Sequence, residues 1–268
     1  MHPYLNTAVK AARRAGEIIV RGLARFEGVE TATKGVNDFV TSIDRAAEAA
    51  IIETLGEAYP HHAFLAEESG ATGSGEVVWI IDPLDGTTNF IHGFPVFPVS
   101  IACQMAGKME HAVIYDPMRQ EIFTASRGAG AYVENKRLRV SRQRTLEGSL
   151  ISTGFPYRDN LALLDNYIDM MKAVIRKASG LRRPGSAALD LAYVAAGRTD
   201  GFWEIGLKPW DTAAGTLLIR EAGGLVATLD GGEYKQNGNI VAGTPRVFNE
   251  LLETLAPFLT PELRESRS

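Results

Sequence analysis

The stretch WIIDPLDGTTNF, from Trp79 to Phe90, guides the interpretation of the whole sequence. An apolar run, residues 77–81, leads directly into two aspartates three positions apart, Asp82 and Asp85, and then into a glycine and two threonines. A tight turn needs an aspartate and a glycine, but it does not need a second aspartate and two hydroxyls as well. The stretch therefore predicts a buried strand that ends in a dense set of oxygen ligands.

Two aspartates in one short turn could share hard cations. Mg²⁺ prefers oxygen ligands at ~2.0–2.1 Å and usually completes its shell with water or phosphate. The carbonyl of Leu84 could add a further ligand, and the backbone amides that follow could open a helix whose N-terminus favours an anion. These amides belong to Gly86, Thr87 and Thr88. Asp-Pro or Asp-Gly alone would indicate a surface turn, but the full string after an apolar strand favours a site where metal and phosphate meet.

Length and composition set the limits for the rest of the chain. The 268 residues, 45% of them hydrophobic, fit one large domain or two small ones with a sizeable core. The net charge of −4 gives no reason to expect direct nucleic-acid binding. A single cysteine, Cys103, cannot form an internal disulfide, and no apolar stretch resembles a signal peptide or a membrane span. We therefore expect a cytoplasmic protein without a membrane partner.

Hydrophobic periodicity predicts two differently organised halves. Residues 77–140 are typical of an antiparallel meander, whereas strands alternate with helices after Gly148, which indicates an α/β half. No linker separates the halves, so we expect one compact unit with lobes of roughly 1–145 and 146–268. The predicted helices are 4–25, 44–58, 161–175, 186–197, 210–224 and 246–255, and the polar stretch 34–44 is predicted to be a loop that leads into a short strand.

Four further carboxylates lie next to apolar stretches or near predicted helix starts, where a charged side chain indicates a specific role. Glu67, the first of a Glu-Glu pair, follows a short apolar run and could join the metal cluster. Asp44 and Asp211 each stand near a predicted helix start, where they could cap the helix or point into a site. Glu204 lies on a short apolar strand, where a charge needs a partner or a purpose.

Three separated motifs, WIIDPLDGTTNF, AEES, and WDTAAG with REAGG, resemble the signatures of the inositol monophosphatase family. This family is a branch of the magnesium-dependent, lithium-sensitive phosphatases. The resemblance runs from about Leu5 to Leu255, and residues 186–211 are similar to the bacterial extragenic suppressor branch of the family. It implies an α/β fold, a layered αβαβα sandwich, and a homodimer.

The resemblance also implies roles for particular residues. The implied ligands of about two to three Mg²⁺ ions are Glu67, Asp82, the Leu84 carbonyl, Asp85 and Asp211. The implied catalytic residues, which orient and activate the attacking water, are Thr87, Asp44 and Glu67. The implied substrate-binding residues are Gly86, Thr87 and Thr88 for the phosphate, and Ala187, Glu204, Asp85 and Asp211 for the alcohol.

The reaction that the resemblance implies is hydrolysis of inositol 1-phosphate and related small phosphate monoesters. It would proceed by direct in-line attack of a metal-activated water, with no phosphoenzyme. A bisphosphate nucleotidase and a fructose bisphosphatase remain alternatives. A phosphatase of the haloacid-dehalogenase type is less compatible, because its motif places two aspartates two positions apart. Members of the suppressor branch are also associated with transcription antitermination and ribosomal RNA maturation, so a regulatory binding protein is the alternative of another class.

Overall fold

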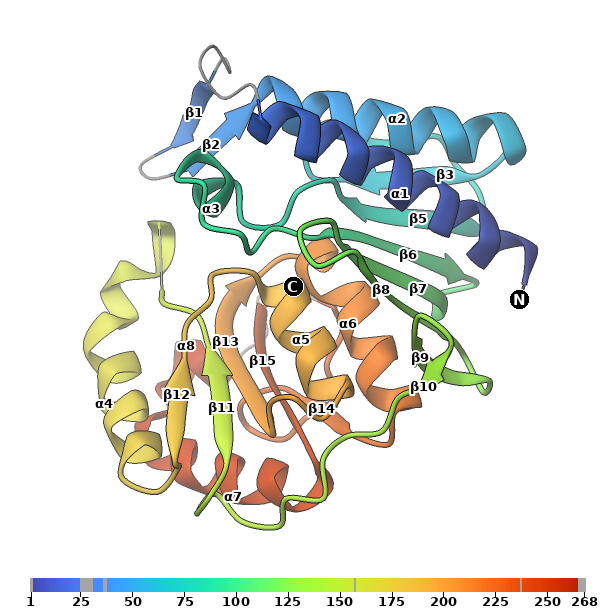
Figure 1. Ribbon diagram of the computed structural model, residues 1–268. Coiled ribbons are helices and arrows are strands. Elements are labelled where there is room, and N and C mark those ends of the chain that lie inside the picture. The colour runs from blue at the N-terminus through green and yellow to red at the C-terminus, as the bar shows by residue number, and fades with distance from the viewer. Residues whose placement is uncertain (1, 25–30, 36–37, 157, 237, 265–268) are drawn as a thin grey trace.

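Helices and sheets form five stacked layers in the computed structural model (Figure 1). Two helices cover one sheet, a second helix pair lies between this sheet and the next, and a third pair covers the outer face of the second sheet. This arrangement is the predicted αβαβα sandwich. The helix pairs are α1 (Pro3–Ala24) with α2 (Ser42–Ala58), α5 (Ala187–Ala195) with α6 (Pro209–Glu221), and α4 (Leu164–Ile175) with α7 (Pro245–Leu255). The structure describes residues 2–24, 31–35, 38–156, 158–236 and 238–264.

The first sheet has eight strands in the order β10-β9-β8-β7-β6-β5-β3-β4. Successive strands from β5 to β10 pair antiparallel, which confirms the predicted meander, whereas β3 pairs in parallel with β5. Because β3 and β5 run in the same direction, Glu67 and Asp82 meet at one edge of the sheet. The strands are β3 (Ala63–Ala66), β4 (Gly70–Thr72), β5 (Val77–Asp82), β6 (Val99–Met105), β7 (Lys108–Asp116), β8 (Glu121–Ser126), β9 (Gly130–Val133) and β10 (Lys136–Arg137).

Strand β5 is buried on both faces, which explains its continuous apolar sequence. Trp79 and Ile81 pack into the core beneath α1 and α2, while Ile80 between them packs into the core around α5 and α6. This alternation follows from the two-residue period of a strand. The strand therefore places its last residue, Asp82, in a region from which helices on both faces exclude water.

The second sheet has five strands in the order β12-β11-β13-β15-β14. β11 pairs in parallel with β12 and β13, whereas β15 is antiparallel to β13 and β14. On β13, Phe202 faces the central helix pair and Trp203 faces α4 and α7. The strands are β11 (Leu150–Thr153), β12 (Gly180–Arg182), β13 (Gly201–Leu207), β14 (Leu225–Ala227) and β15 (Gly238–Gly243).

The structure differs from the sequence prediction mainly before α2. The stretch 34–44, predicted as a loop that leads into a short strand, contains the whole of one strand (Asp38–Thr41) and the end of another (Thr31–Gly35) that pairs with it, and α2 begins at Ser42 instead of Asp44. Thr41 sets this start, because its side chain accepts hydrogen bonds from the backbone of Ile43 and Asp44. The remaining elements are β1 (Thr31–Gly35), β2 (Asp38–Thr41), α3 (Thr87–Ile91), the 3₁₀ turns η1 (Arg158–Leu163) and η2 (Ala256–Phe258), and α8 (Pro261–Arg264). None of the helices in the described residues is long and apolar enough to cross a membrane.

Candidate active site

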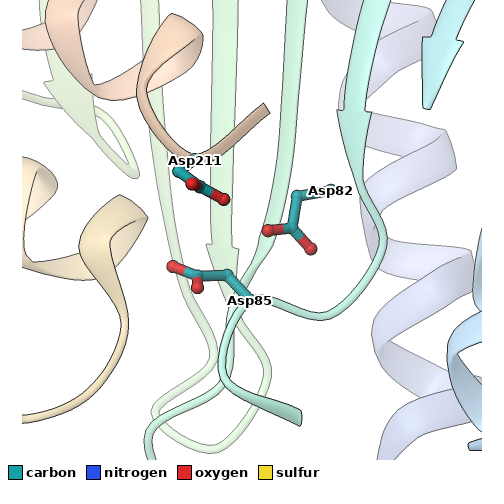
Figure 2. Close-up of side chains that lie close together, drawn as sticks. All are labelled: Asp82, Asp85 and Asp211. Carbon is teal, nitrogen blue, oxygen red and sulfur yellow. The ribbon is translucent and has the colours of Figure 1, made fainter. Parts of the chain in front are cut away.

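Three carboxylates from two distant segments converge where β5 ends (Figure 2). Asp82 is the last residue of β5, Asp85 lies in the turn that follows, and Asp211 lies in the first turn of α6. Each offers an oxygen atom, and these atoms all lie within 4.8 Å of one another. Asp82 is buried, with 1% of its surface exposed, whereas Asp85 and Asp211 are partly exposed. The cluster therefore extends from the buried end of β5 to partly exposed positions.

Local hydrogen bonds fix the turn that carries the first two carboxylates. The backbone N–H of Leu84 donates to Asp82 Oδ1 at 3.0 Å, and that of Asp85 donates to the carbonyl of Pro98 at 3.0 Å. Gly86 then adopts a left-handed conformation with φ 96°, and a β-carbon there would lie 3.0 Å from the carbonyls of Gly185 and Val96. Only glycine fits this position without strain.

Burial and mutual repulsion disfavour the charged forms of the three carboxylates. Burial raises the pKa of Asp82 well above its ordinary value, and the charges of Glu67, Asp85 and Asp211 raise it further. Burial raises the pKa of Asp85 to about 6 and that of Asp211 well above its usual range. Carboxylates placed so close together in a desolvated site need a compensating positive charge. A donor set made only of hard oxygens fits a divalent cation such as Mg²⁺.

A hydroxyl–carboxylate pair lies beside the cluster. Thr87, the first residue of α3, donates its hydroxyl proton to Asp44 Oδ1 at 2.8 Å. The second oxygen of Asp44 accepts hydrogen bonds from the backbone N–H of Thr41, at 2.8 Å, and from its hydroxyl. Asp44 is fully buried, and the Leu84 carbonyl oxygen lies 3.5 Å from Thr87 Oγ1. The Thr87 hydroxyl is thus oriented mainly toward Asp44 on α2, which is the nearer of its two acceptors.

Glu67 lies next to the three-carboxylate cluster without being part of it. Its backbone N–H donates to the carbonyl of Ile81 at 3.1 Å, which places it beside Asp82 at the end of the neighbouring strand. Its charge contributes to the raised pKa values of Asp82 and Asp211. Among the residues that the structure describes, the three aspartates are the only group of three or more Asp, Glu, His or Cys side chains whose ligand atoms all lie within 4.8 Å of one another.

The N-terminus of α5 is tied directly to the cluster. Ser186 Oγ donates to Asp85 Oδ2 at 2.6 Å, and the backbone N–H of Ala188 donates to the same oxygen at 2.8 Å. Ala187, between them, is therefore close to Asp85. From the sequence, Ser186 was predicted only as the start of a helix, because its bond to Asp85 joins residues 101 positions apart. A serine before a helix indicates an N-cap and does not indicate a distant partner.

Glu204 projects from β13 on the side of α5. Burial raises its pKa to about 8, although the positive charge of Arg183 opposes the shift. Its carboxylate occupies space over Gly154, where any β-carbon would overlap it. Asp190 on α5 is also buried and repelled by Glu204, which contributes to the raised pKa of Asp190. Glu204 is thus held in a desolvated place next to the cluster.

The sequence and the fold of this chain are similar to those of known proteins. A model of the inositol monophosphatase family matches residues 1–260. The chain belongs to the inositol monophosphatase family. Nus factor SuhB of Pseudomonas aeruginosa is 54% identical over 270 residues, which cover 98% of this chain and 100% of that protein. The crystal structure of extragenic suppressor protein suhB from Bartonella henselae is 46% identical, covers 93% of this chain and 97% of its own, and superposes with a TM-score of 0.90. The inositol monophosphatase from Anabaena is 38% identical, with 97% of each chain covered and a TM-score of 0.83.

Membership in the inositol monophosphatase family assigns the chain to a group of phosphatases, and it decides against the haloacid-dehalogenase type. The acidic cluster is the place in this fold where the metal of such a phosphatase could bind. The structure brings Asp44, Thr87 and the Leu84 carbonyl to the same place, and the N-terminus of α3 beside them carries Gly86, Thr87 and Thr88. Thr88 is exposed, unlike Thr87.

Proposed function

We propose that the protein is a Mg²⁺-dependent phosphatase that hydrolyses small phosphate monoesters, with inositol 1-phosphate as one substrate. The observation that supports this most directly is the convergence of Asp82, Asp85 and Asp211 beside the Thr87–Asp44 pair. Family membership supports the reaction class. The choice of metal, the substrate and the roles of the individual residues are parts of the proposal.

The three aspartates would hold the metal, with Glu67 and the Leu84 carbonyl as further ligands for about two to three ions. When bound, Mg²⁺ supplies positive charge that offsets the carboxylates, polarises the phosphate and eases deprotonation of the attacking water. The hydrogen bonds to Asp85 from Ser186 and Ala188 occupy one of its oxygens and leave the other for the cation. In this way α5 orients a ligand whose backbone belongs to another lobe.

Thr87 and Asp44 would act on the water. Because the Thr87 hydroxyl donates a hydrogen bond to Asp44, its oxygen lone pairs are directed away from Asp44 and can accept a hydrogen bond from a water molecule. Asp44 is itself held by Thr41, so the hydroxyl is oriented by a chain of two residues. Such an orientation of a nucleophile removes part of the entropic cost of the reaction.

The two ends of the substrate would contact different elements. The N-terminus of α3, with Gly86, Thr87 and Thr88, would surround the phosphate. The alcohol would lie toward α5 and β13, in contact with Ala187, Glu204 and Asp211. With a pKa of about 8, the Glu204 carboxyl is mainly protonated at neutral pH, and it can both donate to and accept from a hydroxyl group.

A panel of phosphate esters tests this proposal. Phosphate release from inositol 1-phosphate, glycerol 2-phosphate, fructose 1,6-bisphosphate and adenosine 3′,5′-bisphosphate is measured with Mg²⁺ and after chelation. We expect Mg²⁺-dependent turnover of the monoesters, with the two bisphosphates slower. A preference for either bisphosphate would replace the proposed substrate class, and the absence of turnover on all four would contradict an enzymatic function.

A second function is favoured by the relatives named Nus factor SuhB, of which two are 54% and 52% identical to this chain over nearly its whole length. We propose that the protein also acts as a factor in transcription antitermination, with transcription elongation factors as partners. Complementation of a deletion strain by Asp82→Asn separates the two roles. Rescue by this variant would show that binding suffices, whereas failure of a folded and expressed variant would tie the phenotype to catalysis.

We further propose that the protein works as a cytoplasmic homodimer, as the family resemblance implies. Light scattering coupled to size-exclusion chromatography measures the molar mass in solution. A mass of twice 29.0 kDa is expected, and a mass of 29.0 kDa at all concentrations would contradict the dimer.

A further inference from the structure

Glu48 is a buried carboxylate to which neither the sequence motifs nor the proposed chemistry gives a role. It lies on α2 with 4% of its surface exposed. Its Oε2 atom accepts a hydrogen bond from the backbone N–H of Glu68 at 2.8 Å, across 20 positions of the chain. A glutamate is rarely this buried in a helix unless a specific partner holds it.

Glu48 and Asp44 lie one turn apart on the same face of α2, because side chains at positions i and i+4 of a helix are neighbours. Asp44 accepts a hydrogen bond from Thr87, which belongs to the segment after β5. Glu48 accepts one from Glu68, which belongs to the segment after β3. One helix face thus uses two carboxylates to hold the two segments that carry the candidate active site.

Hydrogen bonds hold the backbone at Glu67 and at the residue that follows it. Its own N–H donates to Ile81 on β5 at 3.1 Å, and the next N–H in the chain donates to Glu48. The first bond continues the pairing of β3 with β5, but the second depends on a side chain from another layer. Residues 67–69 form the turn between β3 and β4, which the pairing of Ala66 with Gly70 closes. The bond to Glu48 is therefore an additional restraint, from a side chain of another layer, on the turn that carries Glu67.

We propose that Glu48 is a positioning residue that raises the affinity of the active site for divalent cations by holding Glu67 beside Asp82. The inference rests on the proposed function, in which Glu67 is a metal ligand. Glu48 touches neither metal nor substrate, and it acts through the backbone of Glu68. Partners that orient a metal ligand from outside the coordination shell commonly change metal affinity by roughly ten- to hundredfold.

Two substitutions of Glu48 and one matched control test the proposal. Glu48→Met keeps the length of the side chain and removes the acceptor, whereas Glu48→Gln keeps a neutral acceptor oxygen. Glu57, an exposed glutamate on the same helix, provides the control Glu57→Gln. Calorimetry measures Mn²⁺ binding to the metal-free proteins. Hydrogen exchange measures the protection of the Glu68 amide, and phosphate release is followed across a Mg²⁺ titration.

We expect Glu48→Met to expose the Glu68 amide to exchange and to weaken Mn²⁺ binding by roughly ten- to hundredfold. Glu48→Gln should weaken it by about threefold, because a neutral acceptor bonds less strongly than a carboxylate. In both variants, turnover at saturating Mg²⁺ should stay within about threefold of wild type, since the groups that touch the substrate are unchanged. Glu57→Gln should behave as wild type in every measurement.

The outcomes separate this inference from the proposed function. A wild-type protein that binds no Mn²⁺ would overturn both. Wild-type Mn²⁺ affinity in a folded Glu48→Met protein whose Glu68 amide exchanges rapidly would overturn the inference alone. If Glu48→Met does not fold, Glu48→Gln decides, and an affinity equal to that of wild type would overturn the inference. A loss of turnover that saturating Mg²⁺ does not restore would also overturn it.

Discussion

Thr87 donates its hydroxyl proton to Asp44 at 2.8 Å, although 43 positions of the chain separate the two residues. The bond connects the turn after β5 to the first turn of α2. Thr41, the N-cap of α2, holds Asp44 from the other side. The Asp44 carboxylate therefore links Thr41, which starts α2, to Thr87, which is proposed to orient the water.

Because Thr87 and Asp44 form a pair, we expect the losses of activity caused by substituting each of them not to be additive. Thr87→Ala should lower kcat by on the order of 10²–10⁴, the usual range for a group that assists proton transfer. Asp44→Asn should cause a similar loss, and the double variant should be little worse than either single one, because both residues act on one water. Single-turnover kinetics on the three variants measure this. Losses that multiply would show that the residues act independently.

The buried charge of Asp82 predicts opposite effects on activity and on stability. Asp82→Asn should lower kcat by about 10³ or more, because the central carboxylate of the proposed metal site is lost. The metal-free variant should unfold at a temperature equal to or above that of the metal-free wild type, because a desolvated and repelled carboxylate is removed. Activity near wild type at saturating Mg²⁺ would contradict the proposed site, and a large fall in the unfolding temperature would show that Asp82 has a structural role.

The raised pKa values of the site predict how the metal-free protein responds to pH. The pKa of Asp85 is about 6 in the folded protein and 3.8 as its ordinary value, so the folded state binds more protons between these values. Stability from this group is therefore present at low pH and decreases as the pH rises through the folded pKa. Asp82 and Asp211 change stability in the same direction, because their pKa values are also raised.

Cation binding should reverse this loss, because it requires the unprotonated carboxylates. Mg²⁺ should raise the unfolding temperature clearly at about pH 7.5 and little at about pH 5. Differential scanning calorimetry with and without Mg²⁺ at the two pH values checks the prediction. An equal shift at both pH values would mean that the cation binds elsewhere.

Lithium should inhibit turnover, as the resemblance to lithium-sensitive phosphatases implies. Half-maximal inhibition is expected on the order of millimolar Li⁺, a small monovalent ion that would compete for one Mg²⁺ position. Initial rates are measured at low Mg²⁺ and saturating substrate, with Na⁺ at the same ionic strength as the control. Identical rates in Li⁺ and Na⁺ would show that lithium does not inhibit this protein.

The sequence located the parts of the site that lie close together in the chain. Asp82 and Asp85 were predictable because an apolar strand, a proline and a glycine surround them within a few residues. The bond from Ser186 to Asp85 was not, because it depends on how α5 packs between the two sheets. Glu48 was missed although it follows Asp44 by one helical turn, since its partner lies at the end of another strand. The layered fold was predicted from the family resemblance, whereas hydrophobic periodicity predicted only the separate helices and strands.

Substitution of Gly154 by alanine should change the substrate preference of the protein without changing the reaction. A β-carbon at this position would overlap the Glu204 carboxylate, and Gly154 is not among the glycines with positive φ, so alanine fits the backbone. The carboxylate is the flexible end of a side chain and can move away, and Gly154→Ala should therefore fold with Glu204 displaced. The hydrogen bond to the alcohol would then be lost and the substrate hydroxyl left without a partner, which costs about 1–3 kcal/mol.

The displacement of Glu204 should lower kcat/KM for inositol 1-phosphate by roughly ten- to hundredfold. The loss should be much smaller for 4-nitrophenyl phosphate, which has no ring hydroxyls. Glu204→Ala should show the same pattern, and the double variant should be little worse than Glu204→Ala, because both changes remove one contact. Gly56→Ala is the matched control, since a β-carbon on this residue of α2 would meet only Phe64, at 3.9 Å. Equal losses on both substrates would mean that Glu204 serves the metal site or the fold, and an unchanged preference in Gly154→Ala would mean that the carboxylate does not contact the alcohol.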